Sequence, residues 1–180
     1  MQVRAKSESI SSFFKDLKTA IEFAHSHDCK VIINDYVEHV NDLNADGVHL
    51  GVNDCNPDKA RQILGPRKII GLTVHSWEEA EKAKQSDACN YVGIGPVRRS
   101  QTKKQLWPKL SMENFKEIIS FLYPIPAFLI GGLSSKDFNL LRLTGAHGIC
   151  ICSAMHSGKI FGTALNLLLE KRNSYNDTLC

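Results

Sequence analysis

The segment from Tyr91 to Lys104, YVGIGPVRRSQTKK, joins a short apolar run to a polar loop that could bind phosphate. The apolar run ends at Gly95-Pro96, and four cations, two hydroxyl side chains and a glutamine follow. Charged and hydroxyl donors are suited to phosphate oxygens, and the candidate ligands here are Ser100, Thr102 and Lys103. The alternative is a plain surface loop, because lysines in loops usually lie in water.

Two carboxylates elsewhere in the chain, together with three cations, could hold a magnesium diphosphate. Asp35 follows one apolar run, and Asp54 ends the GVND stretch after the next. Mg²⁺ prefers oxygen ligands and usually shares its coordination shell with substrate phosphates. The cations that could neutralise a diphosphate are Arg4, Lys6 and Lys103. Each aspartate also has a structural alternative, because Asp35 could be an N-cap and Asp54 could cap the helix after Asn56-Pro57.

Further polar groups stand at the ends of other apolar runs. In QVRAK, the alternating Gln2, Arg4 and Lys6 would share one face of a strand. Gly131-Gly132 would let backbone N–H groups approach an anion beside the start of a helix. The remaining candidates of this kind are Asn34, Thr73, His75 and Ser153. We interpret His49, which lies inside an apolar run, as a core histidine with satisfied hydrogen bonds.

Short apolar runs and helical patterns alternate along the chain, and they predict the elements that position these residues. The expected strands are a strand end at residues 1–6 and the runs 31–34, 47–50, 68–73, 91–95, 127–132 and 148–153. The expected helices are 9–27, 76–86, 111–122, 134–145 and 159–171, with a further helix after Asn56-Pro57. Runs rich in Val, Ile and Leu are typical of parallel strands, and their alternation with helices predicts βαβ units.

We therefore predict an α/β fold of the (β/α)8 TIM-barrel type. The active site of such a barrel lies at the C-terminal ends of the strands, and every candidate above falls at such an end. Because we count seven strands, we expect the first strand and helix of a closed barrel to be missing at the N-terminus. Neither a GxGxxG nor a GxxxxGK[ST] motif occurs, so a dinucleotide-binding fold and a P-loop NTPase have no support.

The composition is typical of one globular domain, which we place at residues 1–172, with a frayed tail at 173–180. The 180 residues are 43% hydrophobic, and the net charge of +3 is too small to indicate nucleic-acid binding. No apolar run has the length of a membrane span, and the start lacks the core of a signal peptide. We expect a cytoplasmic protein whose six cysteines are reduced, with Cys150 and Cys152 buried as small hydrophobes.

Six motifs, in order along residues 2–156, resemble the thiamine-phosphate synthase family, part of a wider group that includes the thiazole tautomerases. QVRAK is similar to that family's QLREK, and residues 31–54 resemble IINDRVDLALAxxADGVHLGQxD. IIGLTVHSWEEA resembles IIGVSTHTLEEA, and YVGIGPVRRSQTKK resembles YVGxGPxFPTxTK. IPAFLIGGL and GAHGICICSAM resemble IPVVAIGGI and GADGVAVVSAI.

The resemblance implies a (β/α)8 barrel that couples a hydroxymethylpyrimidine diphosphate with a thiazole phosphate, giving thiamine phosphate and pyrophosphate. By position, the ligands of the pyrimidine diphosphate would be Gln2, Arg4, Lys6, Asn34, Thr73 and Lys103. Those of the thiazole phosphate would be Ser100, Thr102, Gly132, Cys152 and Ser153. Mg²⁺ would bind Asp35 and Asp54. The implied mechanism is dissociative: pyrophosphate leaves first, and Arg4, Lys6 and Lys103 act in catalysis by stabilising its charge. The expected partners are these two small molecules, without nucleic acid or membrane, and a homo-oligomer is left open.

The chain departs from the family pattern at a few positions, and two other functions stay open. Arg98 and Arg99 replace Phe-Pro, which predicts a more basic and less rigid loop; Val52 and Ala5 replace Gln and Glu. One alternative is a thiazole tautomerase of the same fold, in which His75 would transfer a proton. The other is a non-catalytic relative that binds thiamine precursors. The retained carboxylates and the Thr102-Lys103 loop favour the synthase, because a tautomerase has no diphosphate to hold.

Overall fold

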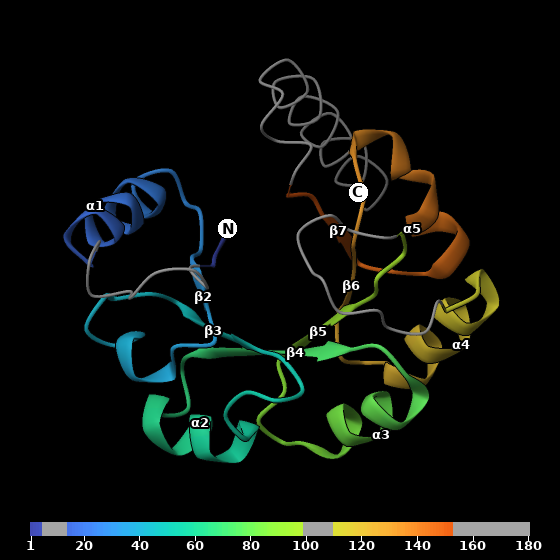
Figure 1. The fold of residues 1–180 in the computed structure, drawn as a ribbon, viewed down its shortest axis with the longest axis horizontal. Helices are drawn as coiled ribbons and strands as arrows, with labels where there is room; N and C mark the ends of the chain where they lie inside the picture. The colour runs from blue at the N-terminus through green and yellow to red at the C-terminus, as the bar shows by residue number, and fades with distance from the viewer. Residues whose placement is uncertain (5–13, 99–109, 153–180) are drawn as a thin grey trace, which may run out of the picture.

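A curled parallel sheet with helices along its outer side makes up the described part of the chain (Figure 1). The computed structural model of the protein describes residues 1–4, 14–98 and 110–152. Its strands are β1 (Gln2–Val3), β2 (Ile32–Asn34), β3 (Gly47–Leu50), β4 (Ile69–Val74), β5 (Tyr91–Ile94), β6 (Ala127–Ile130) and β7 (Gly148–Cys150). They follow one another in chain order and every neighbouring pair is parallel, which confirms the predicted βαβ succession.

The helices lie between the strands in sequence and around the sheet in space (Figure 1). They are α1 (Phe14–His25), α2 (Pro57–Leu64), α3 (Trp77–Gln85), α4 (Met112–Leu122) and α5 (Asn139–Thr144), with short 3₁₀ helices η2 (Val37–His39) and η3 (Ser135–Asp137). The predicted helix at 159–171, the start of the helix predicted at 9–27 and the domain boundary at residue 172 lie outside the described residues. No helix in the described ranges is long and apolar enough to cross a membrane.

Local capping explains where several helices begin and end. The Asn56 side chain accepts from Asp58 N at 2.9 Å and Lys59 N at 3.2 Å, and Pro57 opens α2 with a suitable φ. Ser111 forms the predicted capping box of α4. Gly145 ends α5 in the left-handed conformation, at φ 77°, where a residue without Cβ is favoured.

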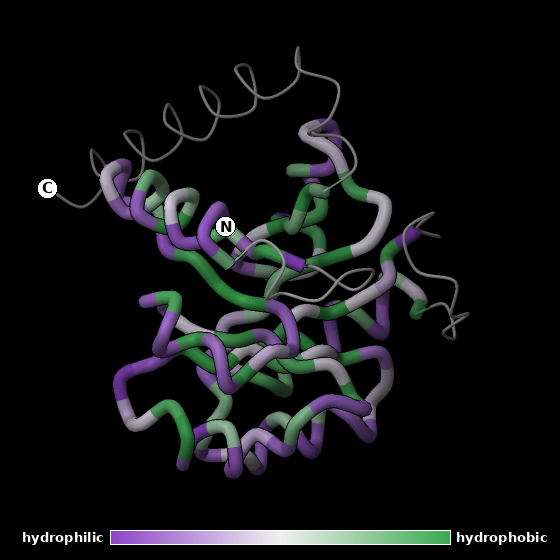
Figure 2. Tube along the Cα trace, turned by 60° about the vertical axis from the view of Figure 1, so that its left-hand side comes forward, coloured by the Kyte–Doolittle hydropathy of each residue, from purple (hydrophilic) through white to green (hydrophobic). Residues whose placement is uncertain are grey.

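The core between sheet and helices is apolar, as the strand sequences predict. Figure 2 shows hydrophobic stretches along the strands, whereas the outer helices alternate between hydrophobic and hydrophilic residues. All four residues of β3 are buried, so this strand is covered on both faces. Buried side chains that represent the helix side of the core are Ile21, Ala80, Phe115, Ile118 and Leu122.

The inner, concave side of the sheet is filled partly by the aromatic ring of Tyr91. This ring packs edge-on against Phe128 of the next strand, with 5.7 Å between the ring centroids. Gly71 on β4 is in register with both His49 on β3 and Tyr91 on β5. A Cβ at Gly71 would lie 2.1 Å from Cζ of Tyr91, so only glycine leaves room for the ring. The seven-stranded, TIM-barrel-like curl confirms the predicted fold class.

The prediction that Cys150 and Cys152 are buried is wrong. Both side chains are exposed, and the other described cysteines, Cys29, Cys55 and Cys89, are partly buried. β7 is an edge strand of the described sheet, with one described neighbour, β6, so fewer described side chains surround its end than surround an inner strand. The five described cysteines form no disulfide with one another.

Gly71→Ala should destabilise the fold by about 2 kcal/mol, because the added methyl group overpacks the space taken by the Tyr91 ring. Urea unfolding of the variant measures this loss. In the background of Tyr91→Ala the ring is gone, so Gly71→Ala should then cost little. An equal cost in both backgrounds would show that the glycine is needed for another reason.

Candidate active site

The described candidates all lie at the C-terminal ends of the strands. Because the strands are parallel, these ends meet along one rim of the curled sheet. The candidates and their strands are Gln2 and Arg4 at β1, Asn34 and Asp35 at β2, Asp54 after β3, Thr73 at β4, Gly132 after β6 and Cys152 after β7. The predicted ligands Lys6, Ser100, Thr102, Lys103 and Ser153 lie outside the described residues.

Asp35 occupies a constrained position at the end of β2. Its φ is 76°, in the left-handed region that aspartate tolerates better than most residues. Its N–H donates to the His49 carbonyl at 3.0 Å, and its Oδ1 accepts from Asn34 Nδ2 at 2.5 Å. Tyr36, not Asp35, holds the N-cap position of η2, so the capping explanation for Asp35 is wrong. Such backbone conformations collect at functional sites.

Asp54 is held by a tight turn after β3. Its Oδ2 accepts from Gly51 N at 2.6 Å, and its own N–H donates to the Gly51 carbonyl at 3.1 Å. A Cβ at Gly51 would lie 2.8 Å from Oδ2, so a side chain there would displace the carboxylate. The cap of α2 is Asn56, and the alternative that Asp54 caps this helix is therefore also wrong.

The two aspartates supply an oxygen-only donor set from neighbouring strands. Oxygen donors suit Mg²⁺, which completes its octahedral shell with water and substrate phosphate rather than with protein alone. No group of three or more His, Cys, Asp or Glu side chains with metal-site geometry occurs in residues 1–4, 14–98 and 110–152. The residues present therefore fit a two-carboxylate magnesium site and give no support to a zinc-type site with nitrogen and sulfur ligands.

A chain of hydrogen bonds crosses the concave side and joins two predicted site residues. His49 Nε2 lies 2.9 Å from Thr73 Oγ1, and His49 Nδ1 lies 3.0 Å from the Tyr91 hydroxyl. The Gln2 side chain also bonds this hydroxyl. Tyr91 and its partners sit on β1, β3, β4 and β5, and the contacts between non-adjacent strands place these side chains inside the curl.

The protonation state of Tyr91 determines which group donates in each of these hydrogen bonds. Burial raises the pKa of Tyr91, while the bond from the Gln2 amide acts to lower it, so the phenol is neutral and keeps its proton. With Gln2 as the donor to the phenol oxygen, the Tyr91 O–H donates to His49 Nδ1. His49 Nε2–H then donates to Thr73, which leaves the Thr73 hydroxyl proton for another acceptor.

His49 was underestimated in the sequence analysis. Its ring bonds are satisfied, as predicted for a core histidine, but they reach the candidate Thr73 on β4 and Tyr91 on β5, and through Tyr91 the candidate Gln2 on β1. Gly93 faces His49: a Cβ at Gly93 would lie 3.3 Å from His49 Cε1, so the imidazole occupies the space that this glycine leaves. The available signal was the alternation within GVHL, which places His49 on the face opposite to Val48 and Leu50.

His75 is turned towards the start of α3. Its backbone N–H donates to Glu79 Oε2 at 2.6 Å, and its ring Nδ1 lies 3.1 Å from the same oxygen. The residue is 5% exposed. Glu79 N in turn donates to Ser76 Oγ at 3.3 Å, so the capping motif and His75 together fix the junction of β4 and α3.

The Gly131-Gly132 turn after β6 is bound to the loop after β5. Arg98 N donates to the Gly131 carbonyl at 3.1 Å, and Arg98 Nη2 pairs with Asp137 Oδ1 at 2.6 Å. Arg98, which was predicted to loosen the loop, is therefore tied at this point; residues 99–109 lie outside the described part. Asp137 was missed in the sequence analysis, although SSKD, with Asp137 three residues after Ser134, is a capping pattern.

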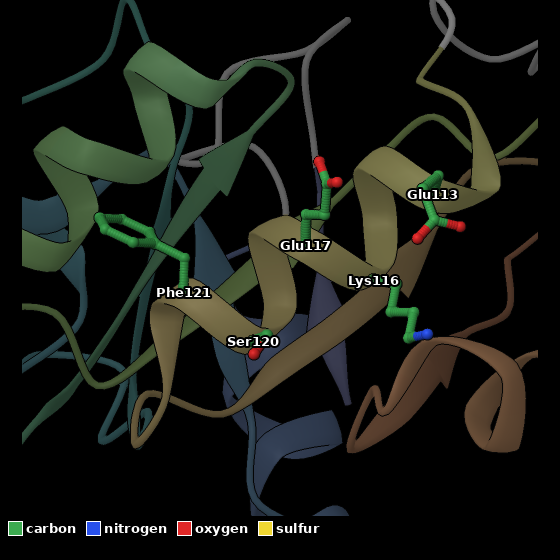
Figure 3. A pocket seen from close by; sticks show the side chains of 5 residues that line it. All are labelled: Glu113, Lys116, Glu117, Ser120 and Phe121. Atoms are coloured by element: carbon green, nitrogen blue, oxygen red, sulfur yellow. The ribbon is translucent and has the colours of Figure 1, made fainter.

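A surface hollow elsewhere does not coincide with these residues. It is lined by Glu113, Lys116, Glu117, Ser120 and Phe121, all of them on α4 in the outer layer (Figure 3). The strand ends, not this helix face, therefore carry the candidate site.

Comparison of the chain with known proteins identifies its family. A family model described as thiamine monophosphate synthase matches residues 1–155. The chain belongs to this family.

Relatives and a solved structure of the thiamine monophosphate synthase family agree with this assignment. Thiamine-phosphate synthase of Flavobacterium johnsoniae is 42% identical over 124 residues, 67% of this chain and 58% of the relative. That of Fusobacterium nucleatum is 35% identical over 96% of this chain and 82% of the relative. The solved thiamine phosphate pyrophosphorylase from Pyrococcus furiosus superposes with a TM-score of 0.78 at 27% identity, covering 91% of this chain and 77% of that one. The predicted function, thiamine-phosphate synthase, a transferase, is confirmed at the level of the family.

Tyr91 should make the free energy of unfolding decrease as the pH rises into the alkaline range. Its pKa is raised in the folded state, so its contribution is complete below about pH 10, the usual tyrosine pKa, and is lost as pH rises above it. Denaturant unfolding between pH 9 and about 11.5 should therefore show a shallower decline for Tyr91→Phe than for the wild type. The matched control is Tyr123→Phe, which removes the hydroxyl group of a tyrosine that is 73% exposed. Equal slopes in both variants would mean that Tyr91 ionises like a surface tyrosine.

Proposed function

We propose that this chain couples 4-amino-2-methyl-5-(diphosphooxymethyl)pyrimidine with a thiazole phosphate, giving thiamine phosphate and pyrophosphate. The observation that carries the proposal is the convergence of Asn34-Asp35, Asp54 and Thr73 on one rim of the sheet in a member of this family. The remaining candidates would supply cations and backbone groups for two phosphate-bearing substrates.

The first half of the site would hold the diphosphate. Asp35 and Asp54 would bind Mg²⁺, which when present neutralises charge on the departing pyrophosphate. Arg4, Lys6 and Lys103 would contact the same oxygens, where negative charge grows as the carbon–oxygen bond breaks. A dissociative reaction requires no nucleophilic side chain, so stabilisation of the leaving group and alignment of the substrates are what the protein must provide.

The hydrogen-bonded chain inside the curl would position the pyrimidine. Gln2 and Thr73 stand at its two ends and are joined through Tyr91 and His49. With His49 donating to Thr73 Oγ1, the Thr73 hydroxyl offers its proton to a substrate acceptor. Asn34 is oriented in a similar way, because its amide donates to Asp35 Oδ1 and to the His49 carbonyl at 3.2 Å.

The second half of the site would hold the thiazole phosphate. Its ligands would be the backbone at Gly132, Cys152 and Ser153 and the hydroxyl groups of Ser100 and Thr102. Of these, Gly132 and Cys152 are described and follow the neighbouring strands β6 and β7. A cytoplasmic location also belongs to this proposal, supported by the substrates' nature as biosynthetic intermediates, and a homo-oligomer stays open.

Asp35→Asn and Asp54→Asn should each raise the Mg²⁺ concentration needed for half-maximal turnover by roughly tenfold or more, because each removes a charged oxygen from a hard ion. Asparagine keeps the size of aspartate and also tolerates the left-handed backbone at position 35, so the variant tests charge alone. Calorimetric titration of Mg²⁺ with pyrophosphate present gives a second readout that is independent of turnover. The control is Glu81→Gln, an exposed carboxylate on α3. Unchanged metal dependence in both aspartate variants would refute the metal assignment.

His75→Gln should keep measurable coupling of the two substrates. In a synthase His75 fixes the start of α3, and a glutamine can still donate to Glu79. A tautomerase would instead need the imidazole as a proton carrier. Product assays with and without a chelator complete the test, since coupling should vanish without Mg²⁺ whereas tautomerisation should not. A wild-type protein that never couples the substrates, and loses tautomerisation in His75→Gln, would establish the alternative.

A further inference from the structure

An ion pair between Arg98 and Asp137 ties the loop after β5 to the turn after β6. Arg98 Nη2 lies 2.6 Å from Asp137 Oδ1, and Arg98 Nη1 donates to the Gly132 carbonyl at 3.3 Å. The backbone of Arg98 joins the same contact, since its N–H donates to the Gly131 carbonyl at 3.1 Å. Arg98 therefore holds the turn through two carbonyls and one carboxylate.

The Asp137 carboxylate is a buried part of this turn. The residue is 7% exposed, and its Oδ2 accepts from Ser134 N at 2.8 Å and from Ser134 Oγ at 3.1 Å. The hydrogen bond from the Arg98 guanidinium lowers the pKa of Asp137 and outweighs the effect of burial. Both carboxylate oxygens of Asp137 are therefore bonded, one by Arg98 and the other by Ser134, and the pair connects η3 with the loop after β5.

The contacts of Arg98 also set the direction of two peptide groups. In a trans peptide the N–H points opposite to the C=O of the same plane. Because the carbonyls of Gly131 and Gly132 face Arg98, the N–H groups of Gly132 and Leu133 point away from the loop after β5. Both glycines have positive φ, at 103° and 63°. Successive N–H groups in such a turn form a concave site for an anion.

We infer that Arg98 and Asp137 are positioning residues for the thiazole phosphate. The pair holds the Gly131-Gly132 turn so that the N–H groups of the turn can bind the phosphate. Arg98 lies on the opposite, carbonyl side of the turn and does not contact the phosphate. The inference rests on the proposed function, which assigns Gly132 to this phosphate. Arg98 stands where the family motif has Phe, so the pair would be a device of this chain and of relatives that share both residues.

Steady-state kinetics with each substrate varied in turn tests the positioning role of Arg98 and Asp137. Arg98→Met and Asp137→Asn should each raise KM for the thiazole phosphate about tenfold, since misplacement by an ångström costs up to roughly a hundredfold. KM for the pyrimidine diphosphate should change by less than about twofold, and the double variant should be no worse than the poorer single variant. Arg98→Lys, which keeps a cation, should recover part of the loss.

The matched control is Lys136→Met. Lys136 is an exposed cation in η3 whose backbone N–H, not its side chain, bonds Ser134 Oγ at 3.3 Å. Its loss changes the local charge and leaves the pair intact, so KM should stay at the wild-type value. A higher KM in Arg98→Met together with an unchanged or lower KM in Asp137→Asn would mean that Arg98 contacts the phosphate directly, which overturns the positioning role. If Arg98→Met fails to fold, the KM values of Arg98→Lys and Asp137→Asn are compared with the wild-type value instead.

Calorimetric titration with thiazole phosphate alone separates this inference from the proposed function. About tenfold weaker binding in Arg98→Met and in Asp137→Asn would support the positioning role even in a protein without coupling turnover, and only the proposed function would then fail. Normal wild-type turnover with unchanged binding in both variants would overturn the positioning role and leave the function standing.

Discussion

The arrangement of the strand ends depends on the packing and the hydrogen bonds of the Tyr91 side chain. Its ring needs the bare backbone of Gly71 beside it and packs edge-on against Phe128. Its hydroxyl is buried and must find hydrogen-bond partners, which it does on β1 through Gln2 and on β3 through His49. Because these strands do not neighbour β5, the bonds favour a curled sheet over a flat one and draw the polar ends of several strands towards one centre.

The rim of the sheet is shaped by backbone features that would otherwise cost stability. Asp35 adopts a left-handed conformation that most residues avoid, and the Asp54 carboxylate is held in place because Gly51 carries no Cβ. At β6, a Cβ at Gly131 would lie 2.7 Å from Pro96 Cβ, so the loop after β5 can approach only a glycine. Each of these features fixes a polar group at the rim, which is typical of sites where alignment matters more than local stability.

The elements were predictable because their signals are local. Apolar runs identify the strands, and Ser76, Ser111 and Gly145 mark helix ends through bonds within a few residues. The location of the candidate site followed from one further step, since parallel strands must end on the same side. The alternation within GVHL indicates which face of the strand His49 occupies, but it could not identify the partners Thr73 and Tyr91, which are 24 and 42 residues away in sequence. The exposure of Cys150 depends in the same way on the sheet's edge, which the apolar run GICIC does not reveal.

The order of the strands also explains how two phosphate-bearing substrates could be kept apart within one rim. The described candidates for the diphosphate and its metal follow β1 to β4, and the described candidates for the thiazole phosphate follow β6 and β7. Between them lies β5, whose Tyr91 anchors the hydrogen-bonded chain towards one side and whose following residue Arg98 anchors the Gly131-Gly132 turn towards the other. A single strand thus orients groups in both halves of the proposed site. In the proposed reaction, a cationic carbon must be aligned with a ring nitrogen, and a shared anchor of this kind would relate the two halves of the site without a catalytic nucleophile.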